Sequence, residues 1–138
     1  MAKFAIQEDY PSAADDVWRF LGDFAGIASW MPGIESCDVT GEGVGAVRKI
    51  GMPGGAQIEE TLEAFDADGR SLSYSIGSGP LPVQNYLATI SVKPDGDGCS
   101  VDWTASFELP EGIPEEPIIQ ALEGAYGGAL GALKKKLA

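Results

Sequence analysis

Two residues of opposite charge, Arg48 and Glu60, lie equally far in sequence from Gly54. If residues 44–51 and 57–65 form an antiparallel hairpin about Gly54, the two charged side chains face each other. Because side chains alternate across a strand, each charge shares a face with apolar residues only. Those residues are Val44, Ala46 and Ile50 on the first strand, and Ile58, Leu62 and Ala64 on the second. Burying two charges is costly unless they are paired, so the sequence predicts an ion pair inside an apolar interior.

This pair has three interpretations. It can be structural and tie two strands together, or it can contact a small molecule in a cavity. In an enzyme, Glu60 would shuttle a proton and Arg48 would stabilise a developing oxyanion. Buried charges occur in structural networks as well as in functional sites, so the residue types alone leave these alternatives open.

The composition excludes several classes of function. The chain has 138 residues and a formal net charge of −12, which argues against nucleic acid as a partner because phosphate binding needs clustered basic residues. It has no histidine, which excludes Ser-His-Asp and Cys-His catalysis and the usual histidine-containing zinc sites. Cys37 and Cys99 lack C-x-x-C spacing, so we expect free cysteines. We expect neither metal nor cofactor.

The two ends of the chain and its hydropathy bear on location. The N-terminal residues lack the apolar run of a signal peptide, and no stretch is apolar enough to span a bilayer. We therefore expect a cytoplasmic protein without membrane insertion. The sequence leaves a monomer and a homodimer equally open.

Periodicity predicts one α+β domain over residues 1–138. A strand at 3–9 precedes two short helices, one beginning near Ser12 and one at 23–29. Runs rich in Val, Ile, Thr, Tyr and Trp, separated by turn residues, then predict an antiparallel meander. Its strands are expected at residues 34–40, 44–51, 57–65, 71–77, 83–93 and 99–109. The alternation of side chains along each strand places Tyr74, Tyr86, Ala88 and Trp103 on the face of the sheet that is shielded from water. Phenol hydroxyls buried there need hydrogen-bond partners.

A long amphipathic helix at residues 114–137 is expected to cover that face. Four glycines interrupt it, at positions 124, 127, 128 and 131. Each costs up to about 1 kcal/mol relative to alanine. They indicate close contact with the sheet, a loose helix, or missing side chains that leave volume between helix and sheet.

This order of elements is the helix-grip order, and the chain resembles the polyketide cyclase/dehydrase-like members of the START/Bet v 1-like (SRPBCC) superfamily. The resemblance covers nearly the whole chain. It rests on Val17-Trp18, Asp23-Phe24, Trp30-Met31-Pro32, Cys37, residues 45–48 and 60–62, Asp66, Tyr74, Asn85-Tyr86 and Trp103. It implies a cavity for hydrophobic ligands between sheet and helix, in proteins that include enzymes, receptors and carriers.

Two plant branches inform individual residues. The segment around Met52 and Pro53 resembles the gate loop of abscisic acid receptors, and Leu81 lies where their latch loop lies. The cavity Glu and Tyr of that family match Glu60 and Tyr86. Those receptors anchor the hormone with a lysine, and the matching position in this chain lies near Met31 and holds no lysine. The resemblance therefore does not imply hormone binding.

Lachrymatory factor synthase is the second similar branch, and its proposed catalytic Arg and Glu match Arg48 and Glu60. The resemblance therefore implies the same pair that strand parity predicts.

The sequence thus predicts binding of a hydrophobic polyketide-, lipid- or terpenoid-like molecule. The predicted ligand-binding residues are Arg48, Met52, Pro53, Glu60, Tyr74, Leu81, Tyr86, Ala88 and Trp103. The alternative is a cyclase, dehydratase or isomerase that uses Glu60 and Arg48, and a third possibility is a structural protein with a collapsed interior.

Overall fold

Seven antiparallel strands form one sheet in the order β1-β7-β6-β5-β4-β3-β2. The computed structural model describes residues 2–137. The strands are β1 (Ala2–Tyr10), β2 (Ser36–Thr40), β3 (Val47–Gly51), β4 (Gln57–Asp66), β5 (Ser71–Ser78), β6 (Gln84–Asp95) and β7 (Gly98–Glu108). The helices are α1 (Ala14–Leu21), α2 (Glu115–Leu137) and the short 3-10 helices η1 (Phe24–Ser29) and η2 (Pro53–Gly55).

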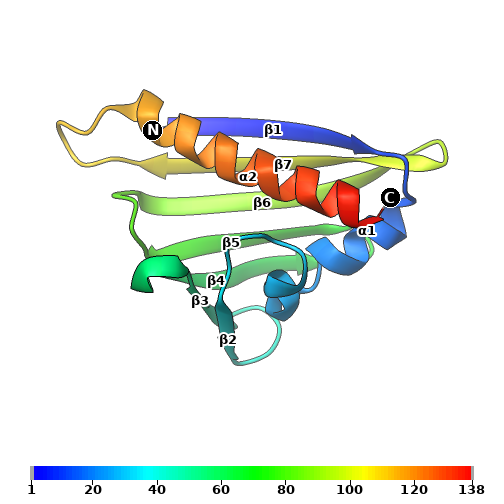
Figure 1. The fold of residues 1–138 in the computed structure, drawn as a ribbon, viewed down its shortest axis with the longest axis horizontal. Coiled ribbons are helices and arrows are strands. Elements are labelled where there is room, and N and C mark those ends of the chain that lie inside the picture. The colour runs from blue at the N-terminus through cyan, green and yellow to red at the C-terminus, as the bar shows by residue number, and fades with distance from the viewer. Residues whose placement is uncertain (1, 138) are drawn as a thin grey trace.

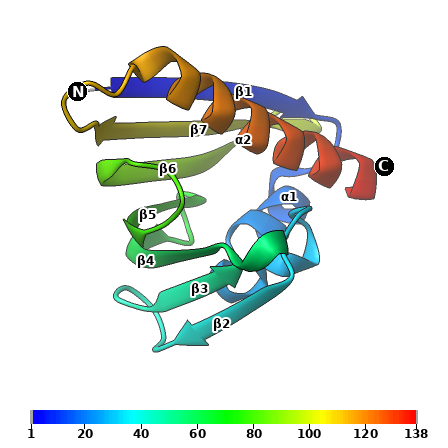
Figure 2. The same cartoon turned by 60° about the vertical axis from the view of Figure 1, so that its left-hand side comes forward.

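The sheet curves around α2, which crosses its concave face and packs most closely on β1 (Figure 1). Helices α1 and η1 lie at the same side of the sheet, below α2, where η1 packs on β2 (Figure 2). This arrangement confirms the predicted helix-grip fold, with two short helices after the first strand. The third short helix, η2, lies in the β3–β4 hairpin and was not expected.

The β3–β4 register is the predicted one. Arg48 pairs with Glu60, and Ile50 pairs with Ile58. The hairpin needs glycine at its tip, because Gly54 and Gly55 have φ values of 86° and 87°, which other residues rarely adopt. The first strand of this hairpin is shorter than expected, so Val44 precedes it and is exposed instead of facing inwards.

The predicted face of Ala64 is wrong. The β4–β5 register shifts between Leu62 and Ala64, so an extra residue reverses the alternation beyond it. Phe65 then pairs with Leu72 and, although 43% exposed, lies against Trp18 of α1, with ring centroids 5.7 Å apart. The bulge thus connects the far end of β4 to α1.

The glycines of α2 do not approach the sheet, and three of the four lie on the exposed side of the helix. A methyl group added at position 124, 127, 128 or 131 would meet nothing within 4 Å outside the helix's own neighbouring backbone. Gly124, Gly127 and Gly128 are exposed. Close contact is therefore a wrong explanation for all four, and missing volume is wrong for the three exposed glycines, which leave α2 with weak helix propensity on its outer side.

Candidate functional site

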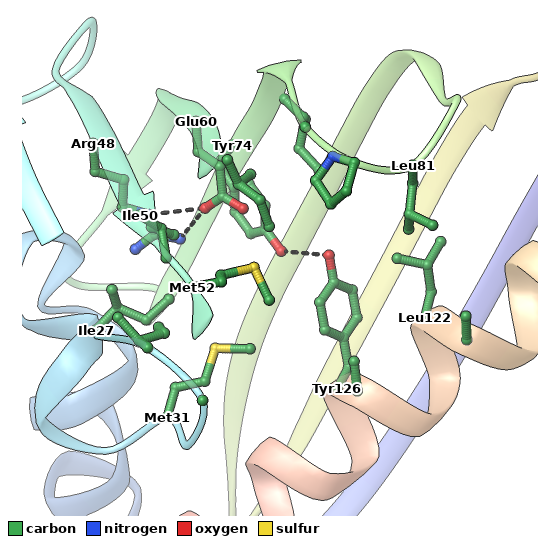
Figure 3. Close-up of a pocket in the computed structure, with 18 of the residues that line it drawn as sticks. Ile27, Met31, Arg48, Ile50, Met52, Glu60, Tyr74, Leu81, Leu122 and Tyr126 are labelled. Carbon is green, nitrogen blue, oxygen red and sulfur yellow. Dashed lines mark hydrogen bonds and ion pairs between the residues drawn. The ribbon is translucent and has the colours of Figure 1, made fainter. Parts of the chain in front are cut away.

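A cavity of about 230 Å³ lies between the sheet and the N-terminal half of α2 (Figure 3). Its walls are mainly aliphatic and come from η1, the loop after η1, strands β3–β5 and β7, the β5–β6 loop and α2. The apolar lining includes Ile27, Met31, Ile34, Ile50, Met52, Ile58, Ile76, Leu81, Val83 and Leu122. The polar lining side chains are those of Arg48, Glu60, Tyr74, Trp103 and Tyr126.

Arg48 and Glu60 form a buried ion pair at one wall of this cavity. The Arg48 Nε donates to Glu60 Oε1 at 2.8 Å, and Nη2 lies 2.6 Å from the same oxygen. The two residues are 5% and 6% exposed. Charge-assisted hydrogen bonds of this length are strong, and they offset part of the cost of removing both groups from water.

The Arg48 guanidinium has further partners besides Glu60. Its Nη1 donates to the Phe24 carbonyl oxygen at 2.9 Å. Its Cζ lies 4.0 Å from the centre of the Phe24 ring and 5.3 Å from that of Tyr74, within cation–π range. Arg48 is thus fixed by η1 and β5 as well as by β4.

Burial raises the pKa of the Glu60 carboxyl above its usual value, while the charge and hydrogen bonds of Arg48 counteract this rise. The side chain is nearly inaccessible to water, so desolvation dominates. A carboxylate with a raised pKa holds a proton more readily than a surface glutamate does. It is therefore suited to accept a hydrogen bond or a proton from a group in the cavity.

The hydroxyl groups of Tyr74, Tyr86 and Tyr126 form a cluster, which we call the tyrosine cluster. Tyr74 donates to the Tyr126 hydroxyl at 3.0 Å, and the hydroxyls of Tyr86 and Tyr126 lie 2.5 Å apart. Burial raises the pKa of all three phenols, so they stay neutral. This cluster links β5, β6 and α2 through hydrogen bonds inside an otherwise apolar interior.

Trp103 forms the floor between the tyrosines and the sheet. Its ring stacks on that of Tyr126, with centroids 4.0 Å apart and planes at 7°. Among the described residues, its Nε1 is the only fully buried side-chain nitrogen or oxygen without a hydrogen-bond partner. This donor is an exception to the rule that buried polar groups are paired.

The structure brings six of the predicted residues to the cavity wall: Arg48, Met52, Glu60, Tyr74, Leu81 and Trp103. Three others are not part of its lining. Pro53 is exposed at the tip of the hairpin. Tyr86 is covered by Phe107, which stacks on it at 5.7 Å, and Ala88 is sealed in the sheet between its neighbours on β5 and β7. Contact of any of these residues with a ligand stays a prediction.

Sequence reasoning missed Tyr126 as a site residue. It belongs to the apolar stripe of α2, four residues from both Leu122 and Leu130, and was assigned only to packing. A phenol within that stripe was the available signal, because its hydroxyl must find a buried partner. Sequence reasoning also missed Ile27 and Met31. These residues lie in η1 and the loop after it, where alternation along a strand cannot predict which side chains face the cavity.

Metal-binding clusters, disulfides and membrane-spanning helices are absent from the part of the chain that the structure describes. Among residues 2–137, no group of three or more His, Cys, Asp or Glu side chains is placed to hold a metal ion. Cys37 and Cys99 are both free thiols. Within the described residues, none of the helices combines the length and the apolar character that a membrane span requires.

Fold and cavity define the chain as a helix-grip protein with a mainly aliphatic internal cavity. Residues 1–138 match the family described as "Polyketide cyclase / dehydrase and lipid transport", so the chain belongs to this family. It is a member of the START/Bet v 1-like superfamily, whose fold binds hydrophobic ligands.

Individual relatives agree with this assignment. The chain is 28% identical to abscisic acid receptor PYL6 of Arabidopsis thaliana over 103 residues, which are 67% of this chain. It spans about half the length of that receptor, 47%. The structure of XoxI from Bacillus cereus is 33% identical, with a TM-score of 0.90 over 99% of this chain and 95% of that one.

A more distant enzyme shares the fold. Norcoclaurine synthase from Thalictrum flavum, solved with dopamine and hydroxybenzaldehyde, is 22% identical with a TM-score of 0.78. The match covers 99% of this chain and 86% of the enzyme. At this identity, the likeness concerns the fold alone.

Proposed function

We propose that this protein binds a hydrophobic small molecule of polyketide, lipid or terpenoid type in the cavity beneath α2. The observation that supports this most directly is an aliphatic cavity with a few convergent polar groups at one wall. Its volume of about 230 Å³ exceeds that of an engineered protein cavity of about 150 Å³ that binds benzene. A ligand with one or two rings, or a short branched chain, is of suitable size.

The rim of the cavity favours adaptable binding. Met31 and Met52 lie close to each other on one side of the cavity, and Leu81 of the β5–β6 loop lies on the other side, near Leu122 (Figure 3). Methionine is unbranched and polarisable, so it fits ligands of different shape. The membership of a family that includes lipid transport is consistent with this interpretation.

The test is titration with prodan, a neutral naphthalene dye whose emission shifts in apolar surroundings. We expect saturable binding of one dye per chain, and its displacement by naphthalene. The variant Ile76→Trp fills the cavity from β5 and should abolish binding, whereas Leu87→Trp, exposed on the outer face of the neighbouring β6, should not. Absence of saturable binding, or equal binding by both variants, would contradict the proposal and favour a structural protein.

A second candidate function is supported by Glu60 specifically. Its raised pKa and its place at the cavity wall suit a general base, with Arg48 beside it to stabilise negative charge on a substrate oxygen. The protein would then be a cyclase, dehydratase or isomerase.

The Kemp elimination of 5-nitrobenzisoxazole tests this second candidate, because a base removes the C–H proton as the N–O bond breaks. A saturable rate that is lost in Glu60→Gln, and kept in Glu59→Gln, would support catalysis. If the elimination is no faster with the protein than with free acetate as the base, catalysis by Glu60 is contradicted and ligand binding remains the proposed function.

A further inference from the structure

The Glu60 carboxylate has one oxygen that no described residue uses. The Nε hydrogen bond and the Nη2 ion-pair contact of Arg48 both go to Oε1, and no described residue donates a hydrogen bond to Oε2. Oε2 is also not among the fully buried atoms that lack a partner, a class that contains only Trp103 Nε1 within the described residues. Since Glu60 lines the cavity, Oε2 faces the cavity as an unoccupied acceptor (Figure 3).

The tyrosine cluster supplies a donor. Three hydroxyl protons serve two hydrogen bonds, so one proton remains. Tyr74 donates to Tyr126, which leaves Tyr86 and Tyr126 to share the other bond. If Tyr126 donated to Tyr86, the remaining proton would lie on Tyr86, which is 2% exposed and outside the cavity lining. An unpaired buried donor is costly. We therefore assign the donated proton of this bond to Tyr86 and the remaining proton to Tyr126, whose side chain lines the cavity.

The charge balance of the cavity decides what kind of ligand these groups suit. The cavity contains one positive and one negative side chain, and each neutralises the other. An ionised ligand would add a charge without a counter-ion in surroundings where unpaired charge is costly. A ligand carboxylate would also lie near the Glu60 carboxylate and be repelled by it.

We infer that the cavity selects neutral ligands with a hydroxyl group that donates to Glu60 Oε2 and an oxygen that accepts from the Tyr126 hydroxyl. Phenols and alcohols with a carbonyl or ether oxygen belong to this class, and carboxylic acids do not. The inference rests on the proposed binding function and narrows its ligand class. It assigns Tyr126 a role in specificity beside the predicted Glu60.

Four naphthalene probes separate the contributions at pH 8, with prodan displacement as the readout. Naphthalene has no polar group, 2-naphthol adds a hydroxyl, 2-acetylnaphthalene adds an acceptor only, and 2-naphthoate adds a negative charge. We expect 2-naphthol to bind at least about tenfold more tightly than naphthalene, because a hydrogen bond to a charged group is strong. We expect 2-naphthoate to bind more weakly than 2-naphthol by a similar factor. Equal affinities for naphthalene and 2-naphthol, or a preference for 2-naphthoate, would overturn the inference.

Glu60→Gln should reverse the charge preference. The variant leaves the Arg48 charge without a counter-ion, so 2-naphthoate can take the place of the Glu60 carboxylate. The ratio of 2-naphthoate to 2-naphthol affinity should therefore rise by at least about tenfold. Glu59→Gln and Glu63→Gln, on the same strand but outside the cavity lining, should leave the ratio unchanged. An unchanged ratio in Glu60→Gln would show that the ion pair does not select ligands.

Tyr126→Phe tests the donor without altering any charge. It should reduce the affinity for 2-acetylnaphthalene relative to naphthalene, and an unchanged ratio would overturn the role of Tyr126.

If Glu60→Gln does not fold, the order of the four probes on the unaltered protein still decides for or against the inference. If neither prodan nor any probe binds, the proposed function itself is wrong. If all neutral probes bind alike, the function stands and the inference fails.

Discussion

Helix α2 covers two regions of opposite character. Beneath its C-terminal half, Ala129, Leu130 and Leu133 are at most 1% exposed, and the Tyr10 hydroxyl donates to the Leu130 carbonyl at 2.6 Å. Beneath its N-terminal half, Leu122 and three neighbouring residues line the cavity. We call these the packed end and the cavity end.

The difference suggests how a fold can contain space without losing stability. A cavity gives up van der Waals contacts along its lining, and this loss must be offset elsewhere. Here the packed end holds α2 against β1, and the tyrosine cluster holds the helix where the two ends meet. The cavity end can then be shaped for a ligand.

The largest expected effect tests whether the cavity end depends on its ion pair. Arg48→Met leaves the Glu60 carboxylate buried without its partner. We expect it to lower the free energy of unfolding by about 3–5 kcal/mol at pH 8, measured by urea denaturation. The matched control is Lys49→Met, an exposed neighbour on the same strand, which should change it by less than about 0.5 kcal/mol. Similar costs for both variants would contradict the burial of the pair.

A leucine pair compares the two ends directly. Leu133→Ala at the packed end creates a new cavity and should cost about 2–5 kcal/mol. Leu122→Ala enlarges an existing cavity, so its cost should lie near the lower limit of that range. The first variant should leave prodan affinity unchanged and the second should alter it. If Leu122→Ala is the more costly variant, the cavity end contributes more to stability than the packed end.

The outer side of α2 should respond in the opposite direction. Gly128→Ala adds a methyl group that meets no neighbour, so it should raise the free energy of unfolding by up to about 1 kcal/mol through helix propensity. Prodan affinity should not change, because the added group points away from the cavity. Gly98→Ala is the contrasting control, since its methyl group would collide with the Tyr10 carbonyl oxygen and destabilise the protein. Destabilisation by Gly128→Ala would indicate a contact on this face.

The sequence predicted the element order and the Arg48–Glu60 register, because both follow from local rules of alternation and turn chemistry. It missed the bulge before Ala64, whose extra residue lets Phe65 reach Trp18, a residue about fifty positions away in the chain. It also missed the role of Tyr126, because the hydroxyls of three separate elements meet only in the folded protein. Alternation along a strand can be read locally, whereas contacts between distant elements cannot.

The smallest expected effect concerns how Glu60 is held at the cavity end. Burial raises its pKa in the folded protein, so between the unfolded value of about 4.3 and the folded value the native state binds more protons. The wild-type protein should therefore lose stability as the pH rises through that window. Glu60→Gln lacks this proton, and its amide oxygen can still accept from Arg48, which also keeps the Phe24 carbonyl and ring.

The stability of the variant relative to that of the wild type should consequently be greater at pH 8 than at about pH 4. Burial raises the pKa of the neighbouring phenols Tyr74 and Tyr126 further above this range, so their titration does not contribute to the difference. Urea denaturation of both proteins at several pH values measures the difference. A wild type that is more stable at pH 8, and loses this advantage in acid, would mean that Arg48 outweighs burial and lowers the pKa of Glu60.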